Sequence, residues 1–247
     1  MAREDGRGAE ELRPLKLEMG INAWAEGSCL IELGLTKVMV TATIEDKVPP
    51  FMRGQGQGWI TAEYGMLPRA TQDRTIREAA RGRQQGRTVE IQRLIGRSLR
   101  AAVNARALGE RSVLIDCDVL QADGGTRTAS ITAGYLAMLQ ALTRFKPRVA
   151  FTEPPIVNRL AAVSLGLHEG QVLLDLNYLE DSKIGVDVNI VMMGDHRLVE
   201  IQGTGEHQSF SRDELNRLLD VAEVGIDRLI EAGAAAFPEG LSLIAAS

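Results

Sequence analysis

The sequence is poor in cysteine and lacks long apolar runs. Its 247 residues include two cysteines, Cys29 and Cys117, which lie in apolar, strand-like runs without a C-x-x-C pair or a Cys/His ligand spacing. A disulfide framework or a zinc site is therefore not expected, and both cysteines are predicted to be buried, reduced thiols. No window approaches the roughly 18 uninterrupted apolar residues of a membrane span. The charged residues 1–16 do not resemble a signal peptide. We expect a cytoplasmic protein.

Motifs for nucleophilic catalysis and for nucleotide binding are missing as well. None of the three histidines has a partner at a metal-ligand spacing, and no G-x-S-x-G nucleophile elbow is present. The phosphate-binding loop G-x-x-x-x-G-K-[ST] and a G-x-G-x-x-G fingerprint after a strand are absent too. The sequence thus argues against a triad hydrolase, a nucleoside triphosphatase of the P-loop class and a dinucleotide-dependent enzyme.

Positive charge is concentrated in one segment of an otherwise acidic chain. Residues 69–106 carry ten arginines, three acids and no lysine, a formal charge of +7, so the net charge of −5 of the whole chain leaves −12 for the other residues. Guanidinium groups bind phosphate oxygens in pairs and keep their proton. The segment therefore indicates an RNA or phosphate binder. The alternative is an arginine-rich helix joined by internal salt bridges.

The second part of this segment predicts an amphipathic helix over residues 88–105. Apolar and small residues recur on one face, and arginines occupy the other. The polar face carries Arg93, Arg97 and Arg100. We expect Arg93 and Arg97 to contact RNA.

The remaining pattern predicts an α+β fold with mixed sheets and packed helices. Strand pairs are expected at residues 29–33 and 37–44, at 161–167 and 171–177, and at 185–193 and 198–202. A further strand at 112–120 precedes a helix at 129–142, and a capping box at Ser211 opens a helix over 214–232. Residues 49–72 are interpreted as a long loop because glycine and proline interrupt any helical period, and residues 203–205 as a short glycine loop. We predict a single domain with an internal pseudo-repeat of about 1–145 and 150–233, followed by a flexible tail at 234–247.

An anion site is predicted where the strand at 112–120 gives way to the following helix. The intervening segment reads Asp-Gly-Gly-Thr-Arg-Thr from Asp123. Glycines allow close approach of the main chain, and the start of a helix presents N–H groups and the positive end of its dipole. Thr126 and Arg127 add a hydroxyl and a guanidinium. The alternative is a plain glycine turn before a helix.

Acidic residues gather in the second half of the chain. Asp175, Glu180 and Asp181 lie close together in the sequence, and Asp187 opens an apolar strand. If Asp181 and Asp187 converge beside a phosphate site, they could hold Mg²⁺ or act as general acid or base. The alternative is that these carboxylates are solvated at strand ends.

Three long motif blocks closely resemble the ribonuclease PH family of phosphorolytic exoribonucleases. They cover residues 58–71, 86–100 and 116–132, and the likeness continues through Asp175-Leu-Asn-Tyr, Glu180-Asp-Ser and Val-Asp-Val-Asn189. The resemblance extends from about residue 5 to 230. It implies the ribosomal protein S5 domain 2-like fold and a phosphate-dependent 3′-to-5′ exoribonuclease, or tRNA nucleotidyltransferase, that trims tRNA precursors. It also implies a homohexamer built as a trimer of dimers.

The resemblance also implies roles for individual residues. Arg87, Gly125, Thr126 and Arg127 match the inorganic phosphate site, and Asp181 and Asp187 match the acidic pair assigned to catalysis or Mg²⁺. The basic loop that holds the RNA acceptor end is matched by Arg69, Arg74 and Arg77, although Asp73 introduces an acid there. Phosphate would attack the last phosphodiester and release a nucleoside diphosphate, in a reaction that runs backwards when diphosphates are abundant.

Two other classes remain as alternatives. A catalytic subunit of an archaeal-type exosome ring would share the fold and phosphate site but would need a second kind of subunit. A non-catalytic RNA-binding ring subunit would keep the arginines and lack the phosphate loop or the acidic pair.

Overall fold

The first half of the chain forms a five-stranded sheet with two helices on one face. The structure is a computed structural model that describes residues 3–148, 151–205 and 208–245. The strands are β1 (Leu15–Met19), β2 (Gly27–Leu33), β3 (Thr36–Glu45), β4 (Trp59–Met66) and β5 (Ser112–Gln121), in the order β1-β2-β3-β5-β4. All pairs are antiparallel except β4 and β5, which makes the sheet mixed. Short helical segments η1 (Pro50–Met52), η2 (Glu78–Arg81) and α2 (Ala105–Leu108) lie in its connections.

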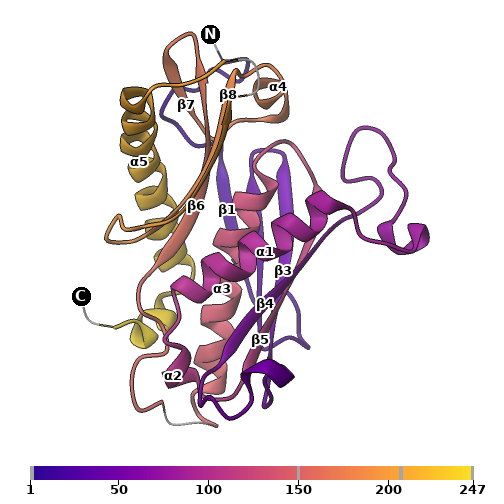
Figure 1. Cartoon of the computed structure of the whole chain (residues 1–247), viewed down its shortest axis with the longest axis vertical. Coiled ribbons are helices and arrows are strands. Elements are labelled where there is room, and N and C mark those ends of the chain that lie inside the picture. Colours follow the sequence, from indigo (N-terminus) through magenta and orange to yellow (C-terminus); the bar gives the residue numbers. More distant parts are fainter. Residues whose placement is uncertain (1–2, 149–150, 206–207, 246–247) are drawn as a thin grey trace.

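The second half forms an antiparallel four-stranded sheet. Its strands are β6 (Leu160–His168), β7 (Gln171–Leu174), β8 (Val186–Met193) and β9 (Leu198–Gly205), in the order β7-β6-β8-β9. The short helix α4 (Tyr178–Asp181) connects β7 to β8. The long helix α5 (Arg212–Ala236) covers the outer face of this sheet, and η3 (Pro238–Leu243) follows it (Figure 1).

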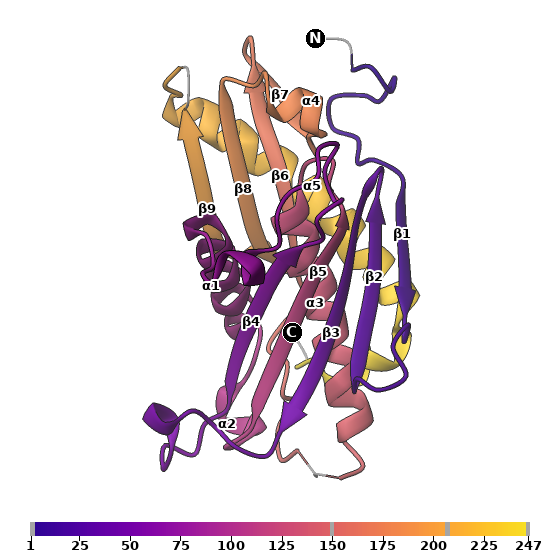
Figure 2. The same cartoon turned by 90° about the vertical axis from the view of Figure 1, so that its right-hand side faces the viewer.

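Helix α3 (Thr126–Phe145) lies between the two sheets and joins the halves (Figure 2). Of its 20 residues, 17 are buried. A helix that is buried on all sides needs small and apolar residues throughout, which is the composition of this segment. Because α3 starts at the end of β5, the loop before it is held at the junction of the halves. The α+β fold expected from the sequence is confirmed, whereas the internal duplication stays a prediction.

Helix α1 (Gly86–Ala101) packs on β4 and also contacts β9 (Figure 2). Its buried face includes Ile91, Leu94, Ile95 and Leu99, as the 3.6-residue period predicts. The helix begins two residues before the expected start and ends at Ala101. It therefore places Arg87 in its first turn.

The expected long loop at residues 49–72 was wrong for its middle part. Strand β4 occupies Trp59–Met66 and pairs in parallel with β5. Its side chains alternate, with Ile60, Ala62 and Tyr64 buried and Glu63 exposed. The alternation of buried and exposed residues that is typical of a half-buried strand is thus present in the sequence, but the glycines before it led to the interpretation as a loop. Residues 203–205, expected as a loop, belong to β9, and β1 was not predicted.

The expected flexible tail at residues 234–247 is packed in its described part. Helix α5 continues to Ala236, and Leu243 is buried in the core of the first half. The backbone of Ile156 exchanges hydrogen bonds with Leu243 and Ala245. The large apolar side chains of this segment, among them Phe237 and Leu243, pack on the core and hold it in place despite its high alanine content. Among the described residues, no helix is both long and apolar enough to cross a membrane.

Candidate active site

A cleft of about 630 Å³ opens where the loop before α3 meets α1, α4, β8 and β9. Every residue expected to bind phosphate or to act in catalysis lines it. They are Arg87, Gly125, Thr126, Arg127, Asp181 and Asp187. These residues come from both halves of the chain. The fold thus brings together side chains that the sequence separates by up to 100 positions.

The loop at Gly124 and Gly125 has a conformation that favours glycine at both positions. Their φ angles are +77° and +67°, in the left-handed region. A Cβ at Gly124 would lie 2.4 Å from the carbonyl oxygen of Leu176, so a side chain there would collide with the backbone of the second half. Gly125 is the N-cap of α3, and no side chain caps the helix. The start of a 20-residue helix is therefore available to an anion.

A buried ion pair lies beneath this loop. The Arg13 guanidinium bonds both carboxylate oxygens of Asp175, at 2.7 and 3.0 Å, and each side chain is 3% exposed. Arg13 also donates to the carbonyl oxygens of Asp123 and, at 3.4 Å, of Gly124. Thr36 donates to the Gly124 carbonyl at 2.7 Å and accepts the Asp123 N–H at 3.0 Å. The loop carbonyls thus face the protein interior.

The Thr126 hydroxyl is held by a side chain from β4. The hydroxyl oxygens of Tyr64 and Thr126 lie 2.9 Å apart and share a buried hydrogen bond. Burial raises the pKa of Tyr64, so this phenol stays protonated and can donate. If Tyr64 donates, the Thr126 hydroxyl proton is left for a ligand in the cleft.

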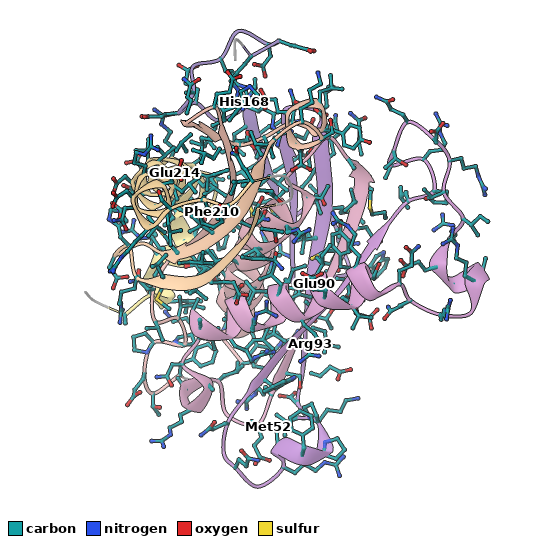
Figure 3. The ribbon with its side chains drawn as sticks, turned by 45° about the horizontal axis from the view of Figure 1, so that its top comes forward. Met52, Glu90, Arg93, His168, Phe210 and Glu214 are labelled. Atoms are coloured by element: carbon teal, nitrogen blue, oxygen red, sulfur yellow. The ribbon has the colours of Figure 1, made fainter. Side chains whose placement is uncertain are left out.

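Arg127 is oriented by two residues that sequence reasoning missed. Its Nη1 donates to the Gln202 side chain at 2.5 Å and lies 4.0 Å from the Glu90 carboxylate. Gln202 in turn donates to Glu90 at 2.5 Å. Glu90 lies on α1, where Figure 3 labels it together with Arg93. The network links α1, α3 and β9. No local sequence pattern predicts hydrogen bonds between residues that are so far apart in the chain.

The two acidic residues reach the cleft from α4 and β8. Asp187 pairs with Gly166 on one side and Thr204 on the other, and Asp181 is the last residue of α4. Among the described residues, no group of three or more histidine, cysteine, aspartate or glutamate side chains could hold a metal. Any cation here would therefore rely on these two carboxylates and on substrate oxygens.

Helix α4 is fixed by a buried arginine from the N-terminal segment. Arg3 forms a bidentate pair with Glu180 at 2.8 Å and donates to the backbone carbonyls of Leu174 and Asp175. Burial raises the pKa of Glu180, but the hydrogen bonds from Arg3 and Asn177 together with the positive charges of Arg3 and Arg7 outweigh it, so the pKa of this carboxyl lies below its ordinary value. The charged pair thereby positions the neighbouring Asp181.

The arginines expected to bind RNA lie outside the cleft. Arg69, Arg74 and Arg77 are exposed on the segment 67–85, which extends away from the body (Figures 1 and 3). On α1, Arg93 is exposed, whereas Arg97 forms a bidentate pair with Glu200 at 2.6 and 2.7 Å. The cleft nevertheless includes Thr71, so the segment begins at its edge.

Family models and known proteins match most of the chain. The model of the 3′ exoribonuclease family, domain 1, covers residues 11–143, and that of domain 2 covers residues 158–225. A ribonuclease PH of Bacillus mycoides (strain KBAB4) is 58% identical over 230 residues, 93% of this chain and 94% of that relative. A ribonuclease PH of Geobacillus sp. (strain WCH70) is also 58% identical over 230 residues, 93% of this chain and 90% of its own.

Two solved structures share the fold at lower identity. The rice (Oryza sativa) protein Rrp46 has a TM-score of 0.76 at 17% identity, covering 94% of this chain and 98% of its own. A chain of the Archaeoglobus fulgidus exosome with RNA bound to the active site has a TM-score of 0.77 at 24% identity, covering 93% of this chain and 92% of its own. At these identities the likeness shows the fold alone.

The ion pair beneath the loop yields a stability prediction. Arg13→Ala removes the bidentate partner of the buried Asp175 carboxylate and leaves it a single longer ion pair, 3.6 Å from Arg7, so the free energy of unfolding should fall by about 3–5 kcal/mol. The double variant Arg13→Ala, Asp175→Ala should lose less than the sum of the single losses, because neither charge remains. Urea unfolding of the three variants measures these differences.

Lys16→Ala serves as the matched control. Lys16 lies on β1 and makes ion pairs at 3.5 Å with two glutamates, but its side chain is 64% exposed. This variant should unfold at nearly the same urea concentration as the parent protein. An Arg13→Ala variant as stable as Lys16→Ala would contradict the role given to the buried pair.

Proposed function

The chain belongs to the 3′ exoribonuclease family, and from this premise we propose that its cleft carries out phosphorolysis of RNA 3′ ends. The protein is a phosphate-dependent 3′-to-5′ exoribonuclease, a tRNA nucleotidyltransferase that trims tRNA precursors and releases nucleoside diphosphates. The observation that carries the proposal is the meeting of two arginines, the uncapped start of α3 and two carboxylates in one cleft.

The phosphate-binding side of the cleft supplies the nucleophile. Arg87, Arg127 and the first N–H groups of α3 would hold inorganic phosphate, with the Thr126 hydroxyl as a further donor. An oxygen of the held phosphate attacks the last phosphodiester in line, and the 3′ oxygen of the shortened RNA leaves. Because two anions must approach each other, guanidinium charge supplies much of the stabilisation. No serine, cysteine or histidine nucleophile is required.

The acidic side of the cleft is suited to the leaving oxygen. Asp181 and Asp187 are hard oxygen ligands, and Mg²⁺ is bound in proteins through one or two carboxylates together with substrate phosphates. The pair therefore fits Mg²⁺, which would supply positive charge beside the reacting phosphates when bound. With or without the metal, Asp187 could hold or deliver a proton for the departing 3′ oxygen.

The RNA would approach along the arginine-bearing segment. Arg69, Arg74 and Arg77 are exposed on a segment that begins at the edge of the cleft, so they could hold the phosphates upstream of the 3′ end. Arg93 is exposed on the adjacent helix and could extend this surface. Arg97 should contribute less to RNA binding, because its guanidinium is bound to Glu200.

The protein should assemble as a closed ring of six copies, a trimer of dimers, as the family resemblance implies. Large apolar side chains remain exposed in the single chain, with Trp24 at 94%, Phe51 at 63% and Ile76 at 53%. Burying such side chains would stabilise contacts between copies. Sedimentation velocity should therefore give a mass near six chains, and a monomer with full activity on tRNA precursors would contradict this assembly. The cytoplasmic location expected from the two buried thiols is part of the same proposal.

Phosphate dependence is the first test of the reaction. RNA degradation should require inorganic phosphate and release nucleoside diphosphates. Arg87→Ala and Arg127→Ala should each raise the phosphate concentration needed by about tenfold to a thousandfold, since each removes a charge-assisted contact worth about 1.5–3 kcal/mol and more in the transition state. Chromatography of the released nucleotides, with and without phosphate, measures both effects.

A matched control is Arg148→Ala. Arg148 is exposed just beyond the far end of α3, so its loss should leave the phosphate requirement unchanged. Nucleoside monophosphates formed equally well without phosphate would overturn the proposed reaction.

A substitution of Asp187 on β8 tests whether this carboxylate acts in catalysis or in RNA binding. Asp187→Asn removes a metal-binding charge and a proton carrier, so phosphorolysis and synthesis from diphosphates should collapse together because they share one transition state. RNA affinity should hold or rise slightly, since a negative charge near a polyanion is lost. Turnover in both directions, with RNA binding measured by filter retention, tests this.

Asp220→Asn is the control, because Asp220 is exposed in the middle of α5, on the outer face of the second sheet. It should behave as the parent enzyme. If Asp187→Asn abolished RNA binding, or slowed one direction alone at equal saturation, Asp187 would lose its catalytic assignment.

A further inference from the structure

A buried hydroxyl on β6 faces the cleft without a hydrogen-bond partner. Ser164 is 5% exposed, its Oγ has no partner in the described structure, and the residue lines the cleft. A buried hydroxyl that bonds nothing costs free energy, on the order of 1–3 kcal/mol. Such a group is expected to satisfy itself with a ligand.

The backbone of Ser164 fixes where this hydroxyl lies. Its carbonyl accepts the Asp175 N–H at 2.7 Å, and the residue pairs in register with Asn189 on β8. Ser164 is therefore held on the strand next to the one that carries Asp187. Strand pairing fixes the backbone and therefore the face of the sheet on which this side chain lies.

The hydroxyl lies against the anion-binding end of α3. A Cβ built on Gly125 would be 3.2 Å from Arg13 Nη2, 3.5 Å from Ser164 Oγ and 3.5 Å from Thr128 Oγ1. Gly125 is the uncapped N-cap of the helix, so Ser164 Oγ lies beside the residue at which α3 begins. The helix start and the unpartnered hydroxyl are independent observations that point to one ligand.

Three other buried polar atoms in the described residues also lack a hydrogen-bond partner, and the comparison with them shows what is particular to Ser164. They are Arg7 Nη2, Ser98 Oγ and Tyr135 OH. None of these three residues lines the cleft. Ser98 is fully buried on α1, and it offers a comparison of the same residue type in the same chemical state.

We propose that Ser164 is a phosphate-binding residue, whose hydroxyl donates a hydrogen bond to inorganic phosphate held at the start of α3. The proposal rests on the phosphorolytic function proposed above. A neutral donor adds direction without adding charge, and it complements the two arginines that neutralise the anion. In the reverse reaction the terminal phosphate of a nucleoside diphosphate occupies the same position and accepts the same bond.

The test compares Ser164→Ala and Ser164→Cys with Ser98→Ala. The first removes the hydroxyl, the second keeps its approximate shape with a much weaker donor, and the third removes a buried hydroxyl elsewhere. Steady-state kinetics should show KM for phosphate raised roughly tenfold or more in Ser164→Ala, since a hydrogen bond to a charged group is lost. KM for RNA should stay within about twofold of the parent value.

Further readouts separate binding from a role in shaping the cleft. Ser164→Cys should also raise KM for phosphate, and both Ser164 variants should raise KM for nucleoside diphosphate in the reverse direction. The salt dependence of phosphate binding should not change, because no charge is lost. Ser98→Ala should match the parent enzyme in every KM.

Several results would overturn the proposal. Unchanged KM for phosphate in Ser164→Ala would do so, as would equal rises in KM for phosphate and RNA, or parental behaviour of Ser164→Cys. The phosphate requirement of the parent enzyme shows whether the Ser164 assignment alone fails or the proposed function fails as well. If the parent requires phosphate and Ser164→Ala is unaffected, the Ser164 assignment alone fails, whereas phosphate-independent degradation by the parent overturns both.

Discussion

The buried pair between Arg13 and Asp175 is the interaction on which the site depends. It joins a segment before β1 to a residue after β7, and the same guanidinium binds the carbonyl oxygens of the loop before α3. Turning those carbonyls inward leaves the opposite edge of the loop to face the cleft. A buried charge pair of this kind adds little net stability compared with an apolar contact, but breaking it is costly. Its effect here is to fix one geometry of the loop relative to the second half.

The arginines of residues 69–106 do several different things, which the charge count alone does not distinguish. Arg87 lines the cleft, and the arginines at 69, 74 and 77 are exposed. Arg97 pairs with Glu200, and Arg100 donates to the Ile60 carbonyl while its guanidinium stacks over the Trp59 ring at 4.4 Å. Internal contacts therefore account for the middle of α1. For the arginines of the preceding loop and of the first turn of the helix, binding of RNA or phosphate stays a prediction.

Local patterns in the sequence predicted those parts of the fold and site that are themselves local. The 3.6-residue period predicted the buried face of α1, and the glycines before Thr126 predicted the turn that precedes α3, although the helix begins three residues before the expected start at residue 129. What escaped prediction depends on contacts distant in sequence: Arg13 meets Asp175 across 162 positions, and Gln202 meets Glu90 across 112. The parallel pairing of β4 with β5 is also long-range, because the partner strand begins 53 residues later. An arginine or glutamine that orients another side chain leaves no periodic signal.

The position of the cleft follows from the electrostatic problem that the reaction sets. Phosphate and a phosphodiester repel each other. Hydrogen-bond donors are therefore needed to bind the phosphate, and separate groups are needed to stabilise the charge on the leaving 3′ oxygen or to protonate it. In this fold the two arginines and the start of α3 belong to the first half, whereas Asp181 and Asp187 belong to the second. Placing both sets on one short segment would let guanidinium and carboxylate neutralise each other. Because α3 contacts both sheets and Arg13 holds the loop before it, the arginines and the two aspartates reach the same cleft from separate supports.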